Sequence, residues 1–215
     1  MEYCISLLVN ADNAIDVAHA ERCPLPFLSC MVDDCLKKGK SVQEGGAVYN
    51  FTGPQGFGIA NMADGLFAVR QLVYDEKKIS MKELKEALIW NYDKGLDAQS
   101  AGDIGTEILK AMKAAGRNVD ASTAAAVLNS LIGMKPEPDK LSRFKEIHDM
   151  IDEVPKFGND IPEVDYFARE VAYTYTKPLQ NYKNPRGGQF QAGLYPVSAN
   201  VPLGGQTGAT PDGRY

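Results

Sequence analysis

Hydrophobic residues recur three and four positions apart along much of this chain, a spacing that places them on one face of a helix. The first predicted helix carries Leu7, Leu8 and Ile15 on its apolar face. Another helix opens at Ser80, which forms a capping box with Glu83 three residues later. In the N-terminal part of the chain the pattern predicts helices over residues 5–20, 27–36, 60–73 and 80–90.

The segment from residue 91 to residue 154 is rich in alanine and lysine and predicts further helices. They cover residues 104–115, 122–131 and 140–151. Asp139 is the expected N-cap of the last, because its carboxylate can accept a hydrogen bond from a free backbone N–H. A final helix is predicted from Pro162, at its first turn, to Tyr175, with Pro178 just past its end.

Two segments have the composition of β-strands. Ala47–Phe51 is followed by Gly53-Pro54, and Gly193–Val201 lies between pairs of glycines. Strands so far apart in the sequence make a poor sheet alone. The chain is therefore predicted to be mostly helical, with a few short strands that need neighbours from outside it.

Composition narrows the class of protein. Of 215 residues, 44% are hydrophobic, enough for a core, and the net charge of −5 is unlike the basic face that nucleic acids or anionic membranes attract. No apolar run approaches the ~20 residues that span a bilayer. The first twenty residues lack the basic start of a signal peptide, so a cytoplasmic location is expected.

The cysteines do not indicate a metal site. Cys4, Cys23, Cys30 and Cys35 have no Cys-x-x-Cys spacing, and the sequence holds just two histidines. No metal is expected, and the four thiols are expected to be reduced and buried.

Several glycine-rich and proline-rich stretches resemble, in their order along the chain, the C-terminal half of the glycyl radical enzymes. These are the pyruvate formate-lyase-like proteins, and the likeness is to their dehydratase, choline trimethylamine-lyase and arylacetate decarboxylase branch. The resemblance rests on His19–Arg22, Pro24–Ser29, Gly45–Ala47, Tyr49-Asn50, Lys156–Asp160, Asn184–Gly188 and Thr210–Arg214.

The resemblance implies an α/β fold, a ten-stranded barrel with the active site in its lumen, of which residues 1–215 form a part. In that family a glycyl radical, made by a separate S-adenosylmethionine-dependent activating enzyme, takes a hydrogen atom from a cysteine, and the resulting thiyl radical attacks a small organic substrate. The cysteine motif, Gly-Cys-x-Glu, and the glycine motif, Arg-Val-x-Gly-Tyr, are both absent from this sequence. No catalytic residue and no bound cofactor are therefore expected in this chain, which should be inactive alone. The complete enzyme is expected to be a homodimer.

The resemblance also suggests substrate-binding residues. Tyr195, in a Leu-Tyr-Pro-Val context, is expected to line the pocket, with Val197 on the same face of a strand two residues later. The alternative is a buried tyrosine whose hydroxyl bonds to backbone. Glu44 and Tyr49 are weaker candidates, and Glu44 is more simply a solvated turn carboxylate.

Residues 91–154 depart from the dehydratase and choline-lyase pattern and are expected to be a helical insertion at the surface. Their length favours a parent decarboxylase over a dehydratase or C–N lyase. The competing hypothesis is a helical binding or adaptor domain without enzymatic activity. Thermal unfolding separates the two, because an adaptor should unfold cooperatively whereas a barrel fragment with unpaired strand edges should aggregate.

Overall fold

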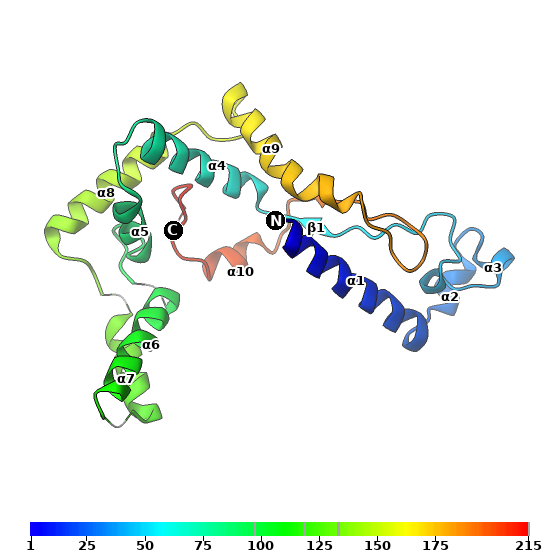
Figure 1. Ribbon diagram of the computed structural model, residues 1–215, viewed down its shortest axis with the longest axis horizontal. Helices are drawn as coiled ribbons and strands as arrows, with labels where there is room; N and C mark the ends of the chain where they lie inside the picture. Colours follow the sequence, from blue (N-terminus) through cyan, green and yellow to red (C-terminus); the bar gives the residue numbers. More distant parts are fainter. Residues whose placement is uncertain (97, 118, 133, 215) are drawn as a thin grey trace. The chain divides into compact units, whose positions relative to one another are not determined.

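The computed structural model describes residues 1–96, 98–117, 119–132 and 134–214, which fall into two units. The first consists of Met1–Ile59 with Ala168–Pro196, and the second of Ala60–Phe167 with Val197–Tyr215. Each unit has an apolar core of its own. Figure 1 traces the chain through them.

Helices open the first unit. The predicted helix 5–20 is confirmed as α1 (Glu2–Arg22). The predicted helix 27–36 is wrong as one element, since the chain forms two short helices, α2 (Pro26–Cys30) and α3 (Cys35–Lys38). Between them Asp34 has a φ of 74°, and a residue in this left-handed conformation cannot continue an α-helix. A 3-10 turn, η1 (Val42–Glu44), follows.

The strands of the first unit are shorter than predicted. Strand β1 (Gln55–Gly56) pairs in parallel with β2 (Gly193–Leu194), with Gln55 opposite Gly193. The predicted strand Ala47–Phe51 is wrong, because the Asn50 side chain donates to the carbonyls of Gly45 and Ala47 and holds this stretch as a loop. The predicted strand 193–201 stops at Leu194.

The end of β2 is followed by a proline and a turn. Pro196 has no backbone N–H to donate to a strand ladder, and α10 (Asn200–Gly205) begins four residues later.

The core of the first unit lies between α1, α9 (Pro162–Leu179) and the segment before β2. It consists of Ile5, Val9, Leu179 and Phe190, with Tyr175, Tyr182 and Ala192 packed against them.

The second unit is helical. The predicted helix 60–73 is confirmed as α4 (Ile59–Val69), which runs into a π-helix, η2 (Arg70–Asp75). Helix α5 (Met81–Ile89) begins with the predicted capping box of Ser80 and Glu83. It contacts α8 (Pro138–Glu153), and the core between these helices includes Leu72, Leu84, Tyr92, Phe144, Ile147 and Ile151.

The alanine-rich segment contains the three predicted helices: α6 (Ala98–Ala114), α7 (Ala121–Leu131) and α8. Helices α6 and α7 lie side by side (Figure 1). Asp139 is not the N-cap of α8, since the helix already begins at Pro138, whose fixed φ suits a first helical position. Pro178 lies inside α9 and not past it. There, near the end of the helix, it removes one hydrogen bond.

Among the described residues, no helix combines the length and the apolar character needed to cross a membrane.

Candidate functional site

Arg186 joins two parts of the first unit that are far apart in sequence. Its Nε donates to Oδ2 of Asp16 on α1 at 3.0 Å. Its Nη2 donates to Oγ1 of Thr52 at 3.0 Å and to the carbonyl of Phe51 at 3.3 Å. The side chains of Arg186 and Asp16 are 18% and 19% exposed. The guanidinium thus binds a carboxylate and a backbone carbonyl at once.

Asn184 makes a second connection, between the loop that contains Asn50 and Thr52 and the loop that contains Gly188. Its Nδ2 donates to the carbonyl of Asn50 at 2.6 Å and to Oγ1 of Thr52 at 2.8 Å, while its Oδ1 accepts from the N–H of Gly188 at 2.8 Å. A Cβ on Gly188 would lie 1.8 Å from the oxygen of Asn50. The two backbones therefore touch at this point, just before the strands β1 and β2 pair.

The predicted residue Glu44 acts in a turn. Its carboxylate accepts from the N–H of Ser41 at 2.9 Å and from its hydroxyl at 2.8 Å, and Ser41 Oγ accepts from the N–H of Glu44. The backbone and side-chain hydrogen bonds from Ser41 lower the pKa of Glu44. Its carboxylate is therefore engaged in capping η1, as the simpler interpretation expects.

Tyr49 is 83% exposed, and no hydrogen bond within the described part of the chain joins it to Glu44. Its neighbour Asn50 is different, because its side chain holds the loop and its Oδ1 is buried with no hydrogen-bond partner among the described residues.

Tyr195 and Val197 do not share a strand. Because β2 ends at Leu194, the alternation expected to place both side chains on one face does not reach them. The Tyr195 side chain is 54% exposed, which is not the buried core tyrosine of the alternative interpretation. Val197 is partly buried and belongs to the second unit. Their roles in substrate binding stay predictions.

Tyr175, on α9, holds the start of β1. Its hydroxyl donates to the carbonyl of Pro54 at 2.9 Å, and the same carbonyl accepts from the N–H of Gly193 at 3.0 Å. Burial, and then the nearby charge of Asp12, raise the pKa of Tyr175, so this phenol stays a hydrogen-bond donor across the physiological range.

Sequence reasoning missed Asp16, Asn184 and Tyr175 as residues that shape this region. Asn184 lies in Asn184–Gly188, one of the stretches on which the family resemblance rests, and this membership could have marked it as a candidate. Asp16 is 170 residues from Arg186, and no local spacing relates the two.

In the second unit, the turn Thr210–Arg214 is held by a buried tyrosine and a partly buried histidine. The Tyr92 hydroxyl donates to the carbonyl of Thr210 at 2.9 Å, and His148 Nε2 lies 2.7 Å from the carbonyl of Gly213. The two rings contact each other with centroids 4.6 Å apart. Burial raises the pKa of Tyr92, which therefore donates at all ordinary pH values.

Asp212 is the charged group of this turn. Its carboxylate accepts from Asn61 Nδ2 on α4 at 2.6 Å, from Thr210 Oγ1 and from the N–H of Arg214. Burial acts to raise the pKa of Asp212, but these hydrogen bonds outweigh burial and the pKa falls below the ordinary value of 3.8. The ionised form is thus the one that the folded state favours.

Replacing Asp212 by asparagine is expected to lower the free energy of unfolding at pH 7 by about 1.5 to 3 kcal/mol, the range for a hydrogen bond to a charged group. Because the folded pKa is below the unfolded pKa, the contribution of the carboxylate is complete above the unfolded value and is lost as the pH falls through the folded value. Urea unfolding from pH 7 to pH 3 should therefore show the two proteins converging at the acid end. Asp139→Asn, at an exposed position with the same change of charge, is the control and should show no convergence. A difference between wild type and Asp212→Asn that stays constant down to pH 3 would contradict this assignment.

The described residues contain no group of three or more His, Cys, Asp or Glu side chains placed to hold a metal ion. The four cysteines are free. The expectation that they are all buried is wrong, since Cys4, Cys23 and Cys30 are exposed and only Cys35 is buried. The first three lie on helix surfaces or ends that the described residues leave exposed.

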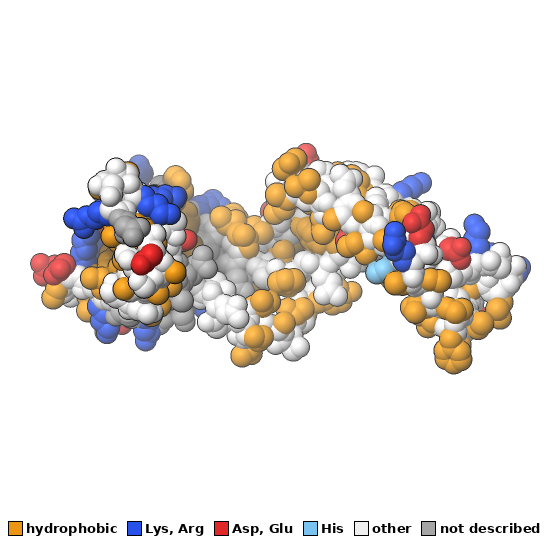
Figure 2. All heavy atoms as spheres, turned by 90° about the horizontal axis from the view of Figure 1, so that it is seen from below, with side chains coloured by type: hydrophobic (Ala, Val, Ile, Leu, Met, Phe, Trp, Pro, Cys, Tyr) orange, Lys and Arg blue, Asp and Glu red, His pale blue; other side chains and the backbone are white. Residues whose placement is uncertain are grey.

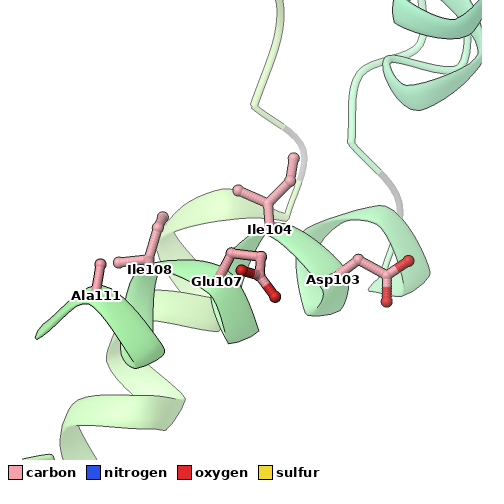
Figure 3. Close-up of a pocket in the computed structure, with 5 residues that line it drawn as sticks. All are labelled: Asp103, Ile104, Glu107, Ile108 and Ala111. Atoms are coloured by element: carbon pink, nitrogen blue, oxygen red, sulfur yellow. The ribbon is translucent and has the colours of Figure 1, made fainter. Parts of the chain in front are cut away.

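A shallow hollow lies on α6 (Figure 3). Its lining residues, Asp103, Ile104, Glu107, Ile108 and Ala111, all come from this helix. One helix face cannot enclose a ligand, and the site residues of the first unit take no part in it, so this hollow is not the candidate site.

Comparison with known proteins relates the chain to dehydratases. It is 32% identical over 213 residues to (2S)-3-sulfopropanediol dehydratase of Klebsiella oxytoca, covering 99% of this chain and 20% of that protein. A solved structure concerning 1,2-propanediol dehydration in Roseburia inulinivorans is 62% identical with a TM-score of 0.88, covering 99% of this chain and 25% of the other. The glycerol-bound B12-independent glycerol dehydratase from Clostridium butyricum is 45% identical with a TM-score of 0.69, covering 99% and 21%.

The chain thus spans between a fifth and a quarter of the length of these relatives. The family described as pyruvate formate lyase-like matches residues 1–204, nearly the whole chain. The resemblance seen in the glycine-rich stretches is therefore confirmed, and the chain belongs to the pyruvate formate lyase-like family of glycyl radical enzymes.

Proposed function

We propose that this chain forms part of the substrate-binding barrel of a glycyl radical dehydratase that acts on a small diol or triol. The observation that carries the proposal is the 62% identity, at a TM-score of 0.88, with the structure concerning 1,2-propanediol dehydration. That alignment covers 99% of the chain and so includes the segment 91–154. The length of this segment therefore no longer favours a decarboxylase as the parent enzyme.

Within such a barrel, the role of this chain is to contribute side chains that bind the substrate. Diols and triols present hydroxyl groups, and a tyrosine hydroxyl is a neutral group that can donate a hydrogen bond to one of them. Tyr195 is the residue we assign to this role, with Val197 as an apolar neighbour. Glu44 and Tyr49 are weaker candidates, because Glu44 caps a turn and Tyr49 is 83% exposed.

The exposed apolar surface supports a larger assembly. Figure 2 shows many apolar side chains open to solvent. Across the two units, the most exposed large apolar residues are Tyr3, Phe27, Leu36, Tyr49 and Val201. Each is more than 70% exposed, which is unusual for so many large apolar residues of a stable protein. We infer that the remaining strands and helices of the barrel cover them.

The radical chemistry would come from outside this chain. The sequence has neither the cysteine motif nor the glycine motif of the family. The complete enzyme would carry the glycyl radical, require an S-adenosylmethionine-dependent activating enzyme, and act as a cytoplasmic homodimer. This polypeptide alone should therefore show no turnover.

The test is a chimera in which residues 1–215 replace the corresponding segment of the Clostridium butyricum glycerol dehydratase. After anaerobic activation, electron paramagnetic resonance should detect the organic radical, and 1,2-propanediol or glycerol should lose water to give an aldehyde. The isolated chain, treated in the same way, should give none. A chimera that carries the radical and converts arylacetates but neither alcohol would contradict the dehydratase assignment. One that carries the radical and converts no substrate would contradict the binding role.

A further inference from the structure

The strand pair β1–β2 carries a glycine on each strand, and a tyrosine ring lies against each glycine. A Cβ built on Gly56 would be 2.6 Å from Cε1 of Tyr175. A Cβ built on Gly193 would be 2.1 Å from Cε2 and 2.8 Å from Cζ of Tyr195. Neither glycine has a positive φ, so the backbone conformation does not require glycine at these positions. What requires it is the space that the two rings occupy.

The two rings differ in how their hydroxyl groups are used. The Tyr175 hydroxyl donates to the carbonyl of Pro54 and is partly buried. The Tyr195 hydroxyl makes no hydrogen bond within the described part of the chain, and its side chain is 54% exposed. The ring of Tyr195 is therefore held by its contact with the backbone at Gly193, while its hydroxyl is left free to donate to a ligand.

We propose that Gly193 is a positioning residue for Tyr195: the missing side chain at position 193 fixes where the tyrosine hydroxyl meets a substrate hydroxyl. The binding step of this inference rests on the proposed function. A methyl group at position 193 would occupy the place of the ring and turn it away from the strand. The blocking atoms belong to a half-exposed side chain that can rotate, so the fold should tolerate the change while the hydroxyl moves.

The position of the ring can be tested on the 215-residue chain itself. In a protein labelled on glycine, the ring current of Tyr195 should displace the Gly193 Hα signals from their ordinary positions, because the ring lies beside this residue. Tyr195→Leu should remove this shift. The Gly58 signal is the control, because nothing lies within 4 Å of a Cβ at that position. A Gly193 signal that does not respond to Tyr195→Leu would overturn the placement.

The consequence for binding is tested in the chimera. Gly193→Ala should raise KM for the diol about tenfold, close to the effect of Tyr195→Phe, which is the size expected for one lost hydrogen bond. The double variant should be no worse than either single one, because both remove the same contact. Gly53→Ala, two residues before β1, is the control: its Cβ would have ordinary contacts at 3.6 Å and its φ is not positive, so KM should not change.

The outcomes separate this inference from the proposed function. If Tyr195→Phe raises KM and Gly193→Ala does not, position 193 does not place the hydroxyl and the inference is wrong. If the unmodified chimera carries the radical but converts no diol, the proposed function fails together with the binding step. The Gly193 signal then decides alone whether the ring is held on the strand.

Discussion

Replacing Gly188 by alanine is expected to lower the free energy of unfolding by about 3 kcal/mol or more, at the upper end of the cost of overpacking. The added Cβ would lie 1.8 Å from the oxygen and 2.3 Å from the carbonyl carbon of Asn50. These are backbone atoms, and Asn184 holds them by a hydrogen bond of 2.6 Å, so no side chain can rotate to relieve the contact. The two loops must move apart, and the hydrogen bonds of Asn184 to both are lost with them.

Urea unfolding of the 215-residue chain, followed by circular dichroism, measures this loss, and two glycines nearby serve as controls. Gly187→Ala introduces only the conformational cost of a φ of +83°, with nothing within 4 Å of its Cβ, and should cost about 1 to 2 kcal/mol. Gly53→Ala meets atoms at ordinary distances and should change stability by less than about 1 kcal/mol. If Gly188→Ala costs no more than Gly187→Ala, the close approach of the loops does not limit stability.

The helices could be predicted from the sequence because their signals are local. The apolar spacing within residues 5–20 and the Ser80–Glu83 capping box each lie within a few turns of one helix, and both predictions are confirmed. The break at Asp34 was not visible, since the residues of 27–36 continue the apolar pattern through a turn. Between the end of α2 at Cys30 and the start of α3 at Cys35, the left-handed Asp34 interrupts the helix that hydrophobicity favoured.

The strand predictions failed because the contacts that decide these segments are distant in sequence. Ala47–Phe51 has the composition of a strand, but its backbone conformation is set by the Asn50 side chain and by contacts with the loop at Gly188. Those partners lie far along the chain, and no window of sequence contains both. The true pairing at residues 55–56 involves glycines, which strand propensity disfavours.

The candidate site shows the same division. Tyr195 was identified from the resemblance of this chain to the glycyl radical enzymes. Its half-exposed side chain fits a ligand contact better than a core position. The residue pattern also predicted that Val197 lies on the same strand face as Tyr195, but the strand ends at Leu194. The contact of its ring with Gly193 and the hydrogen bond from Tyr175 to Pro54 at the neighbouring strand depend on the tertiary fold and became apparent only with the structure.

Removing the Arg186 side chain, by Arg186→Ala, is expected to cost about 2 to 3 kcal/mol of unfolding free energy. Three hydrogen bonds disappear, and the carboxylate of Asp16 is left largely buried without its partner. Complete burial of such a lone charge typically costs about 3 to 5 kcal/mol, and the value here is lower because about a fifth of the Asp16 side chain still meets solvent. High salt should change the loss little, because it screens partly buried pairs weakly.

A double-mutant cycle with Asp16→Asn separates the ion pair from the other contacts. If the pair carries the effect, the two single changes should be non-additive by about 1 to 2 kcal/mol. Arg186→Lys is the matched variant, since it keeps the charge but replaces the planar fork by one ammonium group that cannot reach Asp16, Thr52 and the Phe51 carbonyl together. It should therefore recover part of the loss and not all of it. Full recovery by lysine would mean that charge alone matters, and additive single changes would mean that Asp16 and Arg186 stabilise the loops independently. Either result would remove the reason for treating Arg186 as the residue that joins α1 to the loops that lead into β1 and β2.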